Sequence, residues 1–321
     1  MNCIGVIGLG SISNRHRQNI RQIFKKATII VAPSNPFSTK KNIHNYDIYE
    51  SDFKNLLKHR LDFVIVASPS TFHLNHAEPF IRANIPLLIE KPIAASAKDA
   101  TALLQLIEQY QSKVAVGYCL RFLPSAIKAR EVIKKKMLGS IYNIEINSGS
   151  YLPNWRPGID YKDSVSASQS LGGGALLELS HELDYYQWIF GNIILDKSYL
   201  RSSTELDLEV EDVVDIIGRD SMSNSPVHIH LDFLQKEPIR LLKVLGSKGV
   251  MEWDIINNTV RIRGEKSLQF DYNTYNFEQI YADQLIAFSD SDESRIASAN
   301  ESTDLIKLIE TIKKTGIYLN G

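Results

Sequence analysis

Cysteine is nearly missing from this sequence, which contains only Cys3 and Cys119. Two cysteines exclude a disulfide framework, and their low number agrees with a reducing compartment, so we expect a cytoplasmic protein. The sequence also has no CxxC pair, and we therefore expect no zinc site and no bound metal.

An excess of charge and a long apolar run are missing as well. The 36 basic residues are balanced by 37 acidic ones, so no surface for nucleic acid or for a charged membrane is indicated. No apolar stretch approaches the roughly 20 residues of a membrane-spanning helix, and the N-terminus lacks the basic start of a signal peptide. We expect neither nucleic acid nor a membrane as partner.

Short apolar strands that alternate with helices fill the first part of the chain. A sequence of 321 residues with 44% hydrophobic residues can build two domains. Strands without polar alternation are typical of a parallel sheet covered on both faces. We predict an α/β fold in which residues 1–121 form a dinucleotide-binding Rossmann domain, a doubly wound parallel sheet. Its strands are expected at residues 3–7, 27–32, 63–67, 87–90 and 114–117.

Residues 122–321 have a different pattern, in which polar and apolar residues alternate along most of the strand-like segments. Alternation indicates strands with one buried and one wet face. We predict an α+β domain with an open, mostly antiparallel sheet, which binds the substrate and mediates oligomerisation. One strong helical pattern interrupts it at residues 174–190.

A glycine-rich turn follows the first strand and opens a helix. Gly8 would make the tight turn, Gly10 would let the backbone approach a pyrophosphate, and Ser13 replaces the usual third glycine. We therefore expect Gly8, Gly10, Ser11 and Ile12 to bind a dinucleotide at the helix N-terminus.

The end of the second strand lacks the acidic residue that would bond the ribose 2′-hydroxyl of NAD. Without that carboxylate a 2′-phosphate is not repelled, and Ser34, Asn35 and Lys40 could contact it. This favours NADP as the cofactor. NAD stays open as the alternative, because Asn35 could equally bond its ribose diol.

Glu90-Lys91-Pro92 lies at the carboxyl end of another strand, where ligands bind in doubly wound sheets. A partly buried lysine beside a nicotinamide cation and a sugar hydroxyl can lose or share a proton near neutral pH. The alternative is a surface lysine before a rigid turn.

Four motifs in this order resemble the Gfo/Idh/MocA oxidoreductase family: residues 8–16, 68–73, 90–92 and 117–122. The resemblance implies that the open sheet of the second domain covers the nicotinamide. It also implies that Lys91 binds or polarises the reacting hydroxyl and that the peptide bond before Pro92 is cis. A departure is Cys119, where asparagine is common. Further residues follow from the same motifs: Ser68, Pro69, His73 and Glu90 are expected along the cofactor, and Tyr118 and Arg121 on the substrate side.

The segment Gly172 to Trp188 carries a histidine between two carboxylates. Helical spacing places Glu178, His181, Asp184 and Tyr185 on one stripe. This surrounding suits a general acid/base, although ordinary surface pairing would give the same pattern. The family resemblance implies that His181 is the acid/base, with either Glu178 or Asp184 as its helper. All four residues are expected in the active site.

Trp155 and Arg156 lie in a proline-braced loop before this segment. An indole can stack on a sugar ring, and a guanidinium can grip a carboxylate or phosphate, so the pair would suit a sugar acid or a nucleotide sugar. A loop that merely packs on the sheet explains the same residues.

These observations favour an NAD(P)-dependent oxidoreductase that transfers a hydride between nicotinamide and a secondary alcohol or ketone of a sugar-like substrate. Lys91 and His181 would handle the proton. Two alternatives stay open: glycoside cleavage with NAD but without net redox change, and a non-catalytic NAD(P) sensor. We expect a homodimer or homotetramer.

Overall fold

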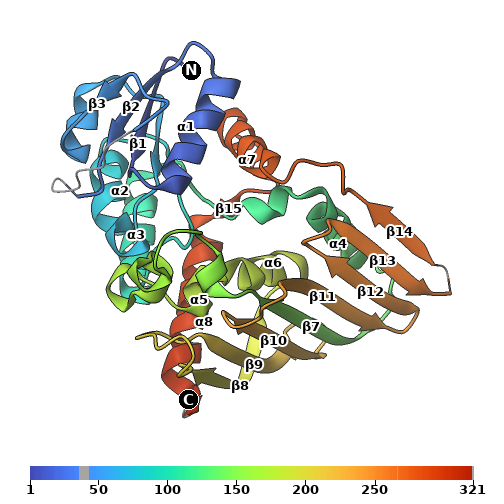
Figure 1. Cartoon of the computed structure of the whole chain (residues 1–321). Helices are drawn as coiled ribbons and strands as arrows, with labels where there is room; N and C mark the ends of the chain where they lie inside the picture. Colours follow the sequence, from blue (N-terminus) through green and yellow to red (C-terminus); the bar gives the residue numbers. More distant parts are fainter. Residues whose placement is uncertain (36–42, 266, 320–321) are drawn as a thin grey trace. The chain divides into compact units, whose positions relative to one another are not determined.

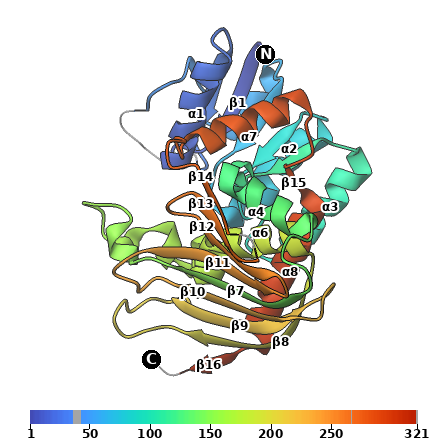
Figure 2. The same cartoon turned by 90° about the vertical axis from the view of Figure 1, so that its right-hand side faces the viewer.

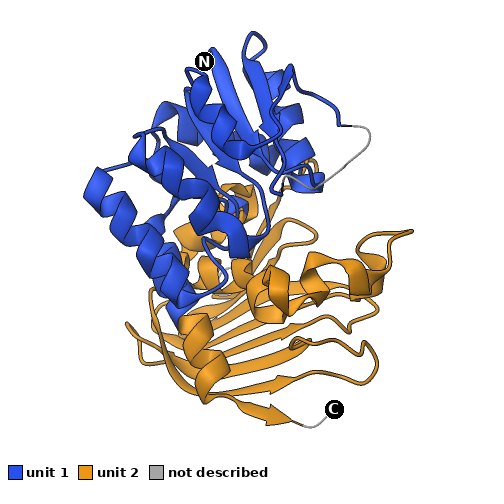
Figure 3. Cartoon of the chain, turned by 90° about the vertical axis from the view of Figure 1, so that its left-hand side faces the viewer, with its two compact units in different colours: residues 1–119, 278–307 blue, residues 120–277, 308–321 orange. Residues whose placement is uncertain are grey.

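The computed structural model describes residues 1–35, 43–265 and 267–319 (Figure 1). The chain forms two compact units: unit 1 contains residues 1–119 and 278–307, and unit 2 contains residues 120–277 and 308–321 (Figure 3). The first boundary lies two residues before the expected one, but residues 278–307 belong to unit 1, whereas the sequence placed them in the second domain. The physical reason is burial: Leu285 and Phe288 pack into the core of unit 1 with Ile4 and Phe63.

Unit 1 is built on a seven-stranded sheet with the order β15-β6-β5-β4-β1-β2-β3 among the described residues. All neighbouring strands are parallel except the β15–β6 pair. The order reverses between β1 and β4, which is where doubly wound sheets bind their ligands. The prediction of a Rossmann-like parallel sheet is confirmed. The strands are β1 (Cys3–Ile7), β2 (Thr28–Ala32), β3 (Ile48–Tyr49), β4 (Phe63–Val66), β5 (Leu87–Ile89), β6 (Val114–Val116) and β15 (Ala297–Ser298).

Helices connect these strands. The α-helices are α1 (Ser11–Ile23), α2 (His73–Arg82), α3 (Ala97–Tyr110), α7 (Gln279–Asp290) and α8 (Ala299–Thr315), whose last turns belong to unit 2. Ser96 explains the start of α3, because its side chain accepts a hydrogen bond from the backbone of Asp99. No helix of the described residues is long and apolar enough to cross a membrane.

Unit 2 contains a nine-stranded sheet with the order β14-β13-β12-β11-β7-β10-β9-β8-β16 among the described residues. Only the β7–β10 and β8–β16 pairs are parallel, so the prediction of a mostly antiparallel sheet is confirmed. The strands are β7 (Ile141–Gly149), β8 (Ile193–Arg201), β9 (Val213–Asp220), β10 (Pro226–Asp232), β11 (Ile239–Gly246), β12 (Gly249–Asp254), β13 (Thr259–Gly264), β14 (Leu268–Asp271) and β16 (Ile317–Leu319).

Helices α4 (Pro124–Lys134) and α6 (Ser180–Phe190) lie over one face of this sheet (Figure 2). The alternation in β10 follows from this arrangement. Val227, Ile229 and Leu231 are buried, whereas His228 and His230 point to the opposite face. On that face His228 Nε2 and His230 Nδ1 each lie 2.9 Å from the Oδ1 of Asp215.

The predicted single helix at residues 174–190 is wrong in one respect. It consists of α5 (Ala175–Glu178) and α6, which are separated at Leu179, where φ is −93° and ψ is 25°. Glu178 and His181 therefore lie on either side of a break and not on one continuous helical stripe.

Candidate cofactor and active site residues

Glycine stands at two positions of the first turn, Gly8 and Gly10, for different structural reasons. Gly8 has a φ of +112°, and a Cβ added to it would lie 2.3 Å from the backbone oxygen of Ala67. Gly10 precedes α1, and a Cβ there would meet no atom within 4 Å. Gly8 is thus needed for packing, whereas Gly10 keeps space open at a helix N-terminus that attracts anions.

Ser13, which stands at the position of the third glycine, stabilises the turn by side-chain hydrogen bonds. Its hydroxyl donates a hydrogen bond of 2.6 Å to the backbone oxygen of Gly8 and accepts one from Arg17. Arg17 also donates to the backbone oxygen of His44 at 2.9 Å and is nearly fully buried, which lowers the pKa of its guanidinium. The sequence analysis did not single out Arg17. Its position one helical turn after Ser13 was the available signal.

The end of β2 is linked to the end of β4 by His76, another residue that the sequence analysis missed. Its Nδ1 lies 2.8 Å from the hydroxyl oxygen of Ser68. Burial and the nearby His73 lower the pKa of His76 to about 4, although a hydrogen bond to the backbone of Ser34 acts in the opposite direction. His76 is therefore neutral at pH 7. Lys40, which the sequence analysis offered to a 2′-phosphate, lies outside the described residues.

His73 joins the two strand-end loops that were expected to contact the cofactor. Its Nδ1 lies 2.9 Å from the backbone oxygen of Pro92, and its Nε2 lies 2.9 Å from that of Ser68. The side chain is fully buried, and this burial lowers its pKa. In the structure His73 bonds only backbone oxygens in these contacts, so any effect on a cofactor acts through the loops.

Glu90-Lys91-Pro92 directly follows β5. The peptide bond between Lys91 and Pro92 is cis, as the resemblance implies. Glu90 is buried: its carboxylate lies 2.6 Å from the Nε2 of His16 and accepts a hydrogen bond of 3.2 Å from the backbone nitrogen of Lys91. Lys91 itself is half-buried at the carboxyl end of the sheet.

His181 lies in the first turn of α6 in unit 2. The glycine-rich entry before it is held by Glu211, whose backbone oxygen accepts from Ala175 at 2.8 Å and whose carboxylate accepts from Leu176 at 3.3 Å. Gly174 has a φ of +105°, and a Cβ there would lie 2.5 Å from the Glu211 carboxylate. The glycine is required for this close approach.

Four residues expected on the substrate side are buried in their own units: Tyr118, Arg121, Asp184 and Tyr185, none more than 2% exposed. Arg121 and Asp184 bond each other at 2.7 and 3.0 Å. The Tyr185 ring packs edge-on against Trp253 with the centroids 4.9 Å apart. In the structure these four side chains contact the protein interior, and their role on the substrate side stays a prediction.

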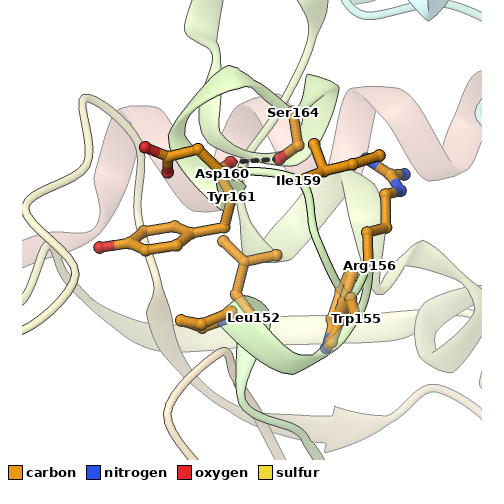
Figure 4. Close-up of a pocket in the computed structure, with 8 residues that line it drawn as sticks. Leu152, Trp155, Arg156, Ile159, Asp160, Tyr161 and Ser164 are labelled. Atoms are coloured by element: carbon orange, nitrogen blue, oxygen red, sulfur yellow. Dashed lines mark hydrogen bonds between the residues drawn. The ribbon is translucent and has the colours of Figure 1, made fainter.

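The loop after β7 forms a small, open crevice in unit 2. Figure 4 shows Arg156 and Ile159 at one side of the crevice and Tyr161 at the other. Trp155 donates a hydrogen bond of 2.8 Å to Ser150 and packs edge-on against Phe233, whereas Arg156 is exposed. The indole thus anchors the loop on the sheet and leaves the guanidinium at the surface.

Two family models match the chain. Residues 3–118 match the oxidoreductase family with an NAD-binding Rossmann fold, GFO_IDH_MocA, and residues 126–252 match the GFO/IDH/MocA C-terminal domain. The chain belongs to this family. The described residues of this Gfo/Idh/MocA protein contain no group of three or more His, Cys, Asp or Glu side chains that could hold a metal ion.

Curated relatives are distant and match over part of their length. The rhizopine catabolism protein MocA of Rhizobium meliloti is 24% identical over 59% of this chain and 57% of its own. Inositol 2-dehydrogenase of the same species, strain 1021, is 24% identical over 58% and 54%. Glucose-6-phosphate 3-dehydrogenase of Bacillus subtilis is 21% identical over 68% and 64%. The chain thus spans a little over half the length of these relatives.

Solved structures share the fold over nearly the whole chain. Levoglucosan dehydrogenase in complex with NADH superposes with a TM-score of 0.83 at 14% identity, covering 98% of both chains. The WlbA dehydrogenase of Bordetella pertussis with NADH and UDP-GlcNAcA has a TM-score of 0.80 at 19% identity, covering 98% of this chain and 95% of its own. At such identities the likeness concerns the fold.

Proposed function

We propose that this Gfo/Idh/MocA protein is an NAD(P)-dependent oxidoreductase acting on a secondary alcohol or ketone of a sugar-like substrate. The observation that carries the proposal is local to unit 1. The open helix N-terminus at Gly10 and the half-buried Lys91 both lie at carboxyl ends of the same parallel sheet. A bound nicotinamide would accept or supply the hydride.

The described residues fit a dinucleotide. The missing Cβ at Gly10 leaves space for a pyrophosphate, and α1 has no acidic residue in its first turn that would repel it. At the end of β2, Ser34, Asn35 and the neutral His76 carry no negative charge. We propose that NADP is accepted there at least as well as NAD, with Lys40 as the cation.

Lys91 and His181 are the proposed proton-handling residues. Lys91 would bind and polarise the reacting hydroxyl, and His181 would take up or return its proton. Asp184 is occupied by Arg121, so we propose Glu178 as the carboxylate that assists His181.

The substrate class is inferred from Arg156 together with the relatives. An exposed guanidinium beside the crevice suits a phosphate or carboxylate. Relatives include a glucose-6-phosphate 3-dehydrogenase, and a structural neighbour was solved with UDP-GlcNAcA. We propose an anionic or nucleotide-activated sugar.

A thermal-shift and absorbance panel tests the proposal. NAD, NADP and NADH are each combined with glucose 6-phosphate, myo-inositol and UDP-N-acetylglucosamine. We expect a dinucleotide to stabilise the protein and one sugar to change the nicotinamide absorbance. Sugar cleavage without an absorbance change would indicate chemistry without net redox, and dinucleotide binding without any turnover would indicate a sensor.

The Lys91→Ala variant tests the role of the lysine. Turnover should fall by about 100-fold or more, because general acid–base groups contribute about 10²–10⁴, while NADH still binds. Lys98→Ala is the matched control, since Lys98 is exposed on α3 of the same unit. Unchanged turnover in Lys91→Ala would exclude the proposed role.

We also propose that the nine-stranded sheet of unit 2 pairs with a second copy of the chain. The pairing would use the face opposite α4 and α6, called here the helix-free face. Ile194, Ile217 and Leu245 are 42–43% exposed, and the strand registers place them on the face that carries His228. Burying such side chains between two copies would favour a dimer or tetramer.

A further inference from the structure

A buried histidine from the first helix contacts the loop that carries Lys91. His16 lies in α1, is fully buried, and its Nε2 is 2.6 Å from the Oε1 of Glu90. The other carboxylate oxygen of Glu90 accepts a hydrogen bond from the backbone nitrogen of Lys91 at 3.2 Å. A chain of two hydrogen bonds therefore connects the cofactor helix to the backbone of the proposed catalytic lysine.

The carboxylate of Glu90 has little room to turn away. Gly117, just after β6, packs so closely that a Cβ there would lie 3.0 Å from the Oε2 of Glu90. On the other side the ring of Tyr281, from α7, meets the His16 ring edge-on with the centroids 6.3 Å apart. Arg15 lies over the same tyrosine ring at 4.6 Å. The pair is thus enclosed by α1, α7 and the ends of β5 and β6.

The charge of the pair follows from its surroundings. Burial raises the pKa of the Glu90 carboxyl, but the hydrogen bond and charge of His16, together with Lys91, lower it below its ordinary value. An ionised carboxylate only accepts hydrogen bonds, so the Nε2 of His16 carries the proton that it donates. Removing His16 would leave a buried carboxylate without its main donor, which is costly.

We propose that His16 is a positioning residue for Lys91, acting through Glu90. His16 holds the Glu90 carboxylate ionised and oriented, and the carboxylate holds the backbone of Lys91, so that the lysine ammonium is placed for the reacting hydroxyl. This inference rests on the proposed function of Lys91. Misplacement by about 1 Å can cost on the order of 100-fold in rate, so a small shift of this loop would be visible.

The test compares His16→Leu, which removes the donor, with His16→Gln, whose side-chain amide can donate from nearly the same place. His59→Leu is the matched control, because His59 forms the same kind of pair with Glu50 at 2.8 Å elsewhere in unit 1. Hydrogen exchange of the Lys91 amide, measured without ligand, reports the loop. Turnover of the active sugar of the panel, and NADH binding by fluorescence, report function.

We expect His16→Leu to speed exchange of the Lys91 amide and to lower turnover by about tenfold or more, with the NADH Kd and the substrate KM within about threefold. His16→Gln should recover most of both, and His59→Leu should change neither. Normal turnover in both His16 variants, or an equal loss in His59→Leu, would overturn the inference.

Two further outcomes keep the inference separate from folding and from the proposed function. If His16→Leu does not fold, Glu90→Gln takes its place. Low turnover in Glu90→Gln, together with near-native turnover in His16→Gln, supports the inference. Native turnover in Glu90→Gln overturns it. If Lys91→Ala is fully active, the proposed function fails. If Lys91→Ala is inactive while both His16 variants are normal, only the role of His16 fails.

Discussion

Arg121 and Asp184 form a buried two-point ion pair, with Nε 3.0 Å from Oδ2 and Nη2 2.7 Å from Oδ1. Each side chain is 2% exposed. The guanidinium also lies 5.7 Å from the centroid of the Trp188 ring. Asp184 and Trp188 both belong to α6, so the pair fixes the helix whose first turn carries His181.

Breaking this pair should destabilise unit 2. In Arg121→Met the Asp184 carboxylate would stay buried without its partner, which costs about 3–5 kcal/mol. Urea unfolding should show this loss. Lys162→Met breaks the pair with Asp207, whose side chain is 83% exposed, and should cause a much smaller loss because solvent screens this pair. Equal losses in the two variants would contradict the structural role of the buried pair.

The two glycines of the cofactor turn should respond differently to alanine. Gly8→Ala places a Cβ against Ala67 at a positive φ, so we expect a clear loss of thermal stability. Gly10→Ala has room in the protein and should fold normally, but its methyl group should weaken NADH binding by about tenfold, or 1.4 kcal/mol. Normal NADH binding by Gly10→Ala would argue against the pyrophosphate at this turn.

The choice of cofactor should depend on Lys40. Lys40→Ala should weaken NADP binding by about tenfold and leave NAD unchanged, because only NADP has a 2′-phosphate for the lysine to contact. Lys58→Ala is the control, an exposed lysine of unit 1. Titration with both dinucleotides measures the effect. Much tighter binding of NAD than NADP by the native protein would reverse the proposed preference.

The free energy of unfolding should fall as the pH becomes alkaline, because His230 loses a proton that stabilises the folded state. Hydrogen bonds that its imidazolium donates to the carboxylates of Asp215 and Asp232 raise the pKa of His230 from 6.5 to about 9. The folded state therefore binds this proton more tightly than the unfolded chain, so the stabilisation is complete below about pH 6.5 and is lost as the pH rises towards 9. His230→Gln should flatten this part of the curve of unfolding free energy against pH. An unchanged slope would exclude His230 as its source.

Oligomerisation should depend on the helix-free face of the large sheet. Ile217→Asp adds a charge at an exposed apolar position of β9 and should convert the oligomer to monomer in sedimentation experiments. The control is Tyr142→Asp, another exposed position, which lies near the start of β7. A native protein that is monomeric, or an Ile217→Asp variant that still assembles, would refute the proposed interface.

Much of the fold and part of the site could be read from the sequence, because the relevant signals are local. The apolar strands, the turn from Gly8 to Ser13 and the strand end at Glu90 to Pro92 are runs of neighbouring residues. Backbone periodicity and turn geometry are set over such short distances. The cis bond at Pro92 was expected only from the family resemblance and is present in the structure.

Tertiary packing decided what these local signals leave open. His16 meets Glu90 across 74 positions of the chain and Arg121 meets Asp184 across 63, and no periodicity relates such partners. Packing also places α7 in unit 1, and the helix predicted at residues 174–190 is interrupted at Leu179. The sequence by itself therefore determined the strands, the cofactor turn and the candidate lysine and histidine. Only the folded chain decided which polar groups pair in the interior, because burial, which makes those pairs necessary, is a property of the whole fold.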